Sequence, residues 1–202
     1  MLTADDESSP ADSIPAALAL EQVLTARRSI YFYRQTAVPV AHLRWALEVA
    51  ILGPNHHRTR PWRFHVFTGA GREQLVQAFM AAAVRLRRDP TEARGRALEA
   101  PVMIVVSCVP DLTNPKVKRE EEEFATAAAI ENLMLALTAV GVGSIWITGA
   151  LATSPEVADA LSLPQAQGRI MGIVEAGYAD LDRRLAPRPP IDHTRFTTWI
   201  DS

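Results

Sequence analysis

The segment "FATAAAIENLMLALTAVGVGSIWI", residues 124–147, is the most apolar window of the chain and constrains the fold most strongly. Glu131 and Asn132 fall near its middle, and Gly141 and Gly143 interrupt its end. A membrane-spanning helix avoids such residues at such positions, so we interpret the segment as a buried helix that runs into a strand. Its part "AIENLMLALTAV" is apolar almost all round, which predicts a place deep in a core or an interface.

Helices and strands are predicted on both sides of this segment. Apolar residues at helical spacing indicate helices at about 13–28 and 37–52. Further helices are predicted at about 71–88 and 117–140, with shorter ones at 91–100 and 154–163, where Ser154 can cap and Pro155 takes the first position. Residue composition indicates strands at 62–67 and 101–109, a short strand and turn at 143–151, and a last strand at 169–179. The run "PVMIVVSCV", residues 101–109, is typical of a strand buried on both faces. Strands interspersed with helices, without strict βαβ alternation, predict an α+β fold around a central sheet.

The bulk properties describe one soluble globular domain. The chain has 202 residues, of which 48% are hydrophobic and 22% charged, enough for a single full core. The acidic, Ser- and Pro-containing residues 1–14 lack the features of a signal peptide and are expected to form a disordered tail before a domain at 15–202. A single cysteine, Cys108, allows no disulfide within the chain, which fits reducing, cytoplasmic conditions.

Several classes of function find no support in the sequence. The net charge of -2 gives no bulk electrostatic reason to expect nucleic acid or an anionic membrane as a partner. His56 and His57 are adjacent, and no further Cys or His stands at ligand spacing, so no metal site is predicted. The stretch "GVGSIW" lacks the third glycine of a dinucleotide fingerprint, and there is no phosphate-binding P-loop or G-x-S-x-G motif.

Three segments indicate a function when their sequences are considered in combination. "ARRSIYFY" (26–33) ends one predicted helix, "GPNHHRTRPWRF" (53–64) lies between a helix and a strand, and "GVGSIWITGAL" (141–151) follows the buried helix. In this order and at these separations they resemble the FMN-dependent nitroreductase family, in particular its small single-domain branch. The resemblance extends from about residue 16 to the end of the chain. It implies a mixed central sheet flanked by helices and an intertwined homodimer with FMN sites at the subunit interface.

The resemblance also implies roles for particular residues. A flavin mononucleotide carries a dianionic phosphate, which guanidinium and hydroxyl groups bind well. The residues implied to bind the cofactor are Arg27, Arg28, Ser29, Asn55, His56, Trp146, Ile147 and Thr148. Arg27 and Ser29 would reach the phosphate and ribityl chain, and the Asn55–His56 segment would line the flavin ring. No catalytic acid or base is named, because the flavin carries the redox chemistry in this family.

The sequence departs from the family at some of these positions. Tyr31 stands where relatives often have an arginine after Arg-Arg-Ser, and Ile147 stands where some relatives have a polar or basic side chain. Arg188, in "APRPP", is placed to resemble a C-terminal arginine that contacts the phosphate.

The activity that the resemblance implies is that of an FMN-dependent oxidoreductase. NADH or NADPH would serve as reductant, and nitroaromatics, quinones or similar flat molecules would serve as acceptors in a ping-pong mechanism. Two alternatives stay open. One is another flavin chemistry on the same scaffold, such as a dehalogenase or an oxidase-like reaction, and the other is a protein that binds FMN or another ligand without turnover.

Overall fold

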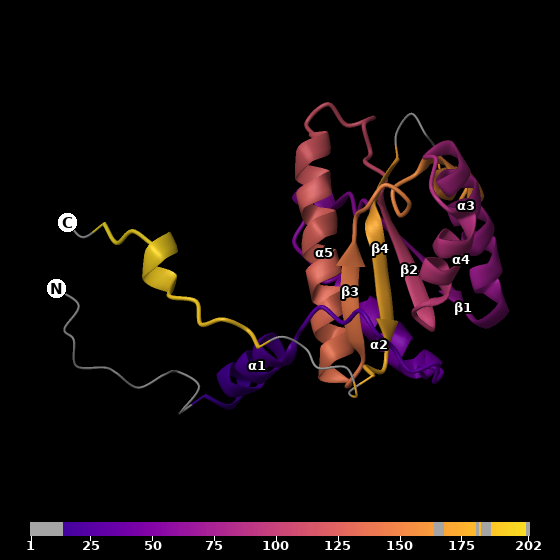
Figure 1. The fold of residues 1–202 in the computed structure, drawn as a ribbon. Coiled ribbons are helices and arrows are strands. Elements are labelled where there is room, and N and C mark those ends of the chain that lie inside the picture. Colours follow the sequence, from indigo (N-terminus) through magenta and orange to yellow (C-terminus); the bar gives the residue numbers. More distant parts are fainter. Residues whose placement is uncertain (1–13, 164–167, 181, 183–186, 201–202) are drawn as a thin grey trace.

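The structure is a computed structural model that describes residues 14–163, 168–180, 182 and 187–200 (Figure 1). Its elements follow in the order α1 (Pro15–Ala26), α2 (Val40–Ala50), β1 (Trp62–Thr68), α3 (Arg72–Arg85), α4 (Pro90–Leu98), β2 (Val102–Cys108), α5 (Arg119–Ala139), β3 (Gly143–Ile147), α6 (Pro155–Ala160) and β4 (Arg169–Gly177). Each helix and strand predicted from the sequence is present, with ends that shift by a few residues. The expected N-terminal tail lies outside the described residues, except for Ile14, which stands at the N-cap of α1.

The strands form one sheet in the order β1-β2-β4-β3. All neighbouring strands pair antiparallel, so that Val66 lies opposite Ile104 and Ile104 lies opposite Val174. Within the described residues, the parallel component expected of a mixed sheet is a single bridge between Ser29 and Ser144. This bridge places the chain that follows α1 along the outer edge of β3.

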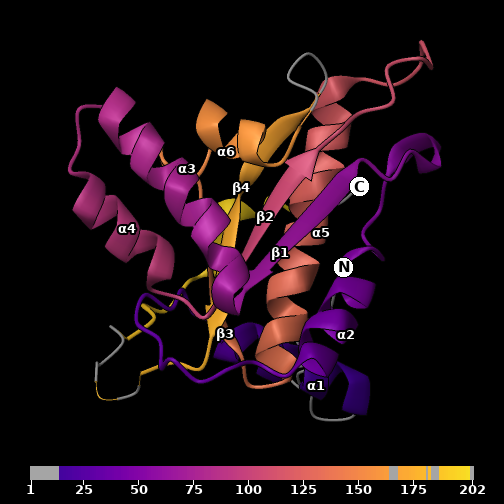
Figure 2. The same ribbon diagram turned by 90° about the vertical axis from the view of Figure 1, so that its right-hand side faces the viewer.

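Helices cover both faces of the sheet (Figure 2). Because side chains of a strand alternate between faces, Ile104 and Val106 of β2 pack toward α2 and α5. Met103 and Val105 of the same strand pack toward α3, α4 and α6. The continuous apolar run of β2 is therefore buried on both faces, as predicted, and its last residue, Cys108, is buried as well.

The long helix α5 runs across one face of the sheet (Figure 1). Ile130, Leu133 and Leu137 are fully buried on its sheet side, which confirms its predicted place in the core. Phe124, by contrast, is 63% exposed, so part of the helix remains uncovered in a single chain. Among the helices described, none is both long and apolar enough to cross a membrane.

Candidate functional site

The first group of candidate residues lies where α1 ends. Arg27 is the C-cap residue with extended backbone, half-buried like Arg28, and Ser29 is exposed. The Ile30 amide donates a hydrogen bond of 3.1 Å to the carbonyl oxygen of Ser144, which fixes this stretch beside β3. A Cβ at Gly143 would lie 2.7 Å from Cγ1 of Ile30, so the close approach requires glycine at this position. Arg27, Arg28 and Ser29 are thus held at the edge of the sheet.

The charges around Arg27 come from distant parts of the chain. Its Nε atom lies 3.4 Å from Oε1 of Glu131 on α5. Arg188 donates a hydrogen bond of 2.5 Å from Nη2 to the carbonyl oxygen of Arg27 and one of 3.4 Å from Nη1 to that of Leu24. The C-terminal segment therefore brings a second guanidinium group to the end of α1.

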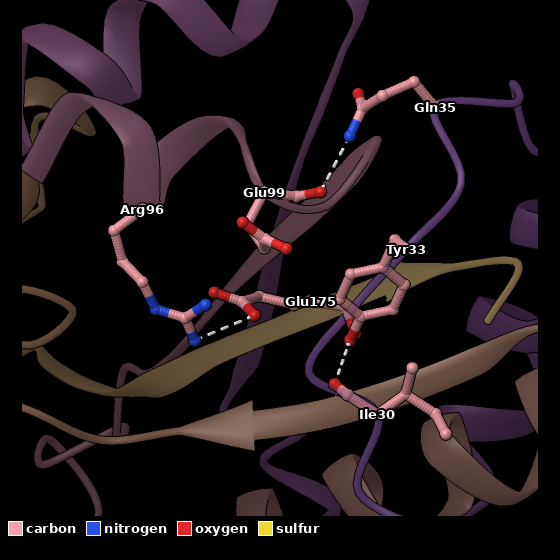
Figure 3. A network of polar contacts seen from close by, with 6 residues as sticks. All are labelled: Ile30, Tyr33, Gln35, Arg96, Glu99 and Glu175. Carbon is pink, nitrogen blue, oxygen red and sulfur yellow. Dashed lines mark hydrogen bonds and ion pairs between the residues drawn. The ribbon is translucent and has the colours of Figure 1, made fainter. Parts of the chain in front are cut away.

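A buried polar network anchors the same stretch (Figure 3). The Tyr33 hydroxyl donates to the carbonyl oxygen of Ile30 at 2.7 Å and lies 3.3 Å from the carbonyl oxygen of Glu175. The Glu175 carboxylate is fully buried and pairs with Nη2 of Arg96 on α4 at 3.0 Å. Burial raises the pKa of Glu175 to about 7 and raises that of Tyr33 as well. Gln35 completes the network by donating to the carbonyl oxygen of Glu99 at 2.9 Å.

The second group of candidates lies at the end of β3. Trp146, Ile147 and Thr148 line a cavity of about 620 Å³ between β3 and α4, to which Arg96 also contributes. Trp146 and Thr148 also border a second hollow of about 610 Å³ next to Arg169. The indole Nε1 of Trp146 donates to the carbonyl oxygen of Met171 at 3.0 Å, which fixes the orientation of the ring.

The third group lies in the loop between α2 and β1, which we call the histidine loop (residues 53–61). Asn55 precedes a 3-10 turn, η2 (His56–Arg58), and both Asn55 and His56 line a hollow of about 260 Å³ beside Phe124 of α5. His57, Arg58 and Arg60 have positive φ angles of 55°, 55° and 50°. Such backbone costs on the order of 1 kcal/mol or more per non-glycine residue, so other contacts must hold the loop in this form.

Those contacts come from α5. The Asn55 side chain donates a hydrogen bond of 2.8 Å to the Thr59 hydroxyl, which donates one of 2.7 Å to Oε1 of Glu122. Glu122 is 1% exposed.

The structure brings the first two groups together and keeps the third apart. Ser29 is paired with Ser144 of β3, the strand that ends in Trp146 and Ile147. Asn55 and His56 border a different hollow and lie beside the N-terminal half of α5. Glu122, which holds the histidine loop, and Glu131, which pairs with Arg27, are nine positions apart on this helix, or roughly 13 Å along its axis. Within one chain the eight candidate residues do not line a single cavity.

Sequence reasoning missed two sets of residues. Glu175 is a lone acidic residue in the buried strand β4, and that contrast with its apolar neighbours could have drawn attention to it. Glu122 belongs to the run "KREEEE", whose acids suit the positive end of the helix dipole and so do not stand out individually in the sequence. Its spacing from Ala125 and Ala129, on the buried side of α5, was the signal that distinguished it from the other acids.

Comparison with known proteins places this arrangement in a family. The sequence pattern of the Nitroreductase family matches residues 24–178. The Bacillus subtilis (strain 168) protein YfhC, whose name provisionally describes it as an NAD(P)H nitroreductase, is 32% identical over 184 residues, which are 88% of this chain and 93% of that protein. The crystal structure of a nitroreductase-like family protein from Bacillus cereus is 28% identical with a TM-score of 0.78, covering 91% of this chain and 96% of that one.

A second solved structure is that of a nitroreductase with bound FMN from Bacteroides fragilis NCTC 9343. It is 25% identical with a TM-score of 0.69 and covers 90% of this chain and 98% of that one. The matches extend over nearly the whole fold and include all three segments that carried the resemblance. The chain belongs to the Nitroreductase family.

Proposed function

We propose that this protein is an FMN-dependent oxidoreductase that uses NADH or NADPH to reduce nitroaromatics, quinones or similar flat acceptors. The observation that carries the proposal is the placement of Arg27, Arg28 and Ser29 beside β3, whose end lines a cavity of about 620 Å³. Family membership supports the coarser assignment to the oxidoreductases. When bound, FMN supplies reversible two-electron redox chemistry, and the protein contributes binding and orientation.

The chemistry of the described residues fits such a cofactor. The Arg188 guanidinium group lies at the main-chain carbonyl of Arg27, and Ser29 is exposed two positions further along, so guanidinium and hydroxyl donors for a phosphate are available at the end of α1. Trp146 and Ile147 supply apolar surface for a flat ring at the end of β3, and Thr148 adds a hydroxyl. Asn55 and His56 are proposed to contact the ring from the histidine loop.

We also propose that the protein is a homodimer in the cytoplasm, with each cofactor site completed across the subunit interface. The separation of the histidine loop from Arg27 and β3 within one chain supports a site built from two chains. Helix α1 buries no residue within one chain, and the C-terminal segment extends away from the sheet (Figure 1). Large apolar side chains are exposed on these parts and on the neighbouring helices: Leu18, Leu20, Leu24, Trp45, Phe124, Phe196, Trp199 and Ile200. Burial of such side chains is what a stable interface needs.

Light scattering tests the dimer directly. The full chain is expected to have twice the mass of one subunit at micromolar concentration, and removal of residues 187–202 is expected to weaken that association. A full-length protein that is monomeric under these conditions contradicts the dimer.

Steady-state kinetics test the activity. Protein loaded with FMN is expected to oxidise NADH or NADPH in the presence of a nitroaromatic or a quinone. The nucleotide and the acceptor are proposed to occupy the same site in turn, so double-reciprocal plots at several acceptor concentrations should be parallel. FMN binding without oxidation of either nucleotide would favour a binding protein. Oxidation with oxygen alone as acceptor would favour an oxidase-like reaction.

A further inference from the structure

The histidine loop is attached to α5 at three successive points. Gly53 begins the loop so close to the helix that a Cβ there would lie 3.3 Å from the main-chain nitrogen of Ala129. Trp62, which directly follows the loop, packs against Ala125 and Ala129 in a small buried cluster. Between these two apolar contacts lies the middle attachment, in which Asn55 donates a hydrogen bond to Thr59 and Thr59 donates one to Glu122.

The middle attachment differs from the other two because it determines a side-chain orientation. The Asn55 Nδ2 atom donates to the Thr59 hydroxyl at 2.8 Å and to the carbonyl oxygen of His56 at 3.0 Å. Both contacts fix the amide of Asn55 relative to the turn that carries His56. The Thr59 hydroxyl has its shortest contact, 2.7 Å, with the buried carboxylate of Glu122, and a longer one of 3.2 Å with the His56 carbonyl oxygen.

The burial of Glu122 that this attachment requires lowers the stability of the fold. Glu122 is 1% exposed, and its second oxygen, Oε2, has no hydrogen-bond partner among the residues that the structure describes. A buried carboxylate with an unused acceptor is unfavourable for folding. An apolar side chain would fill the same position on α5 without that cost, so an acceptor at this position is better explained by the Thr59 hydroxyl that it holds than by core packing.

We propose that Thr59 and Glu122 are positioning residues that hold the Asn55–His56 segment in the orientation in which it contacts the flavin. This inference rests on the proposed function. Neither residue lines the hollow beside His56, so each acts through Asn55 and the turn and not by touching the ligand.

FMN titration followed by flavin fluorescence tests the inference in the full-length protein. Thr59→Val keeps the shape of the side chain but removes the hydroxyl, so it should weaken FMN binding about tenfold, the equivalent of one buried hydrogen bond. Thr59→Ser restores the hydroxyl and should recover most of the affinity. Glu122→Met, an apolar side chain of similar size, removes the acceptor for the Thr59 hydroxyl and should weaken FMN binding to a similar extent.

Thr138→Val is the matched control. Thr138 lies near the end of the same helix, and its hydroxyl donates to the carbonyl oxygen of Met134 at 2.9 Å. This variant loses the same atoms without touching the loop and should bind FMN like the wild type. Hydrogen exchange of the peptide that covers residues 54–61, measured without FMN, should be faster in Thr59→Val and unchanged in Thr138→Val.

The outcomes separate the two claims. A wild-type protein that binds no FMN overturns the proposed function and this inference with it. A wild-type protein that binds FMN, with Thr59→Val binding equally well, overturns only the inference. Weakened binding that Thr59→Ser does not recover would assign the loss to packing and would also overturn it.

Discussion

Arg188 donates a hydrogen bond of 2.5 Å from its Nη2 atom to the main-chain carbonyl oxygen of Arg27. The two residues are 161 positions apart in the sequence, yet the segments that carry them meet where α1 ends. A carbonyl group at a helix end favours a cation nearby, which accounts for the position of Arg188. This contact supports the proposal that the end of α1 binds the phosphate of FMN.

Arg188→Ala is expected to weaken FMN binding about tenfold, because it removes a cation that holds the main chain of Arg27 and would add positive charge beside a bound phosphate. Isothermal titration with FMN and with riboflavin separates the two contributions. The loss should be confined to FMN, since riboflavin has no phosphate. Arg195→Ala, an exposed arginine in the same C-terminal segment, is the control and should leave FMN affinity unchanged. Equal losses for FMN and riboflavin would argue against phosphate contact.

Glu131→Gln is expected to have the opposite effect. Oε1 of Glu131 lies 3.4 Å from Nε of Arg27 and would compete with an incoming phosphate for the guanidinium group. Both side chains are partly exposed, so the gain should be modest, about two- to fivefold in FMN affinity. Raising the salt concentration should reduce the difference between the variant and the wild type. Weaker binding in the variant would show that Glu131 orients Arg27 instead of competing for it.

The buried Glu175 predicts a dependence of stability on pH. Its pKa rises from an ordinary value of 4.5 to about 7 on folding, because burial disfavours the charged form. The folded state therefore binds the proton more tightly, and this contribution to stability is present below pH 4.5 and lost as the pH rises through 7. Between pH 5 and 8 the free energy of unfolding should fall by about 2–3 kcal/mol from this group alone.

Urea unfolding of the wild type and Glu175→Gln across this pH range measures that contribution as the difference between them. The comparison is needed because His65, whose pKa is lowered by burial, titrates in both proteins and acts in the opposite direction. Glu156→Gln, which removes a carboxylate whose pKa is lowered by its hydrogen bond with Arg85, is the control and should leave the slope between pH 5 and 8 unchanged. Parallel curves for the wild type and Glu175→Gln would contradict the assignment.

A substitution at Gly172 of β4 tests how tightly Trp146 packs against this strand. It has a φ of +139°, and a Cβ there would overlap Nε1 of Trp146 and the carbonyl oxygen of Ile147. Gly172→Ala should therefore destabilise the fold by about 2–4 kcal/mol in urea unfolding. Gly95→Ala is the matched control, because Gly95 lies within α4 with no atom near its Cβ position. That variant should be more stable by about 0.5–1 kcal/mol, and destabilisation of similar size in both variants would contradict this account.

The sequence predicted what depends on local patterns. The N-terminal acids and long apolar second half of α5 and the unbroken apolar run of β2 were sufficient to identify both elements, because their burial follows from their own residues. The pairing of Ser29 with Ser144 could not be read in this way, since it depends on how distant segments meet. The same holds for the positive φ angles at His57, Arg58 and Arg60, which no glycine marks in the sequence. The separation of the histidine loop from Arg27 also depends on distant contacts, because the two contact different parts of α5.

The visible absorption spectrum of the purified protein, recorded after addition of FMN and desalting, tests the central claim most directly. The account predicts flavin bands that stay with the wild-type protein and are reduced in Arg27→Ala, while Arg195→Ala retains them. A wild-type protein that emerges colourless would contradict the claim that the end of α1 and the end of β3 form a flavin site.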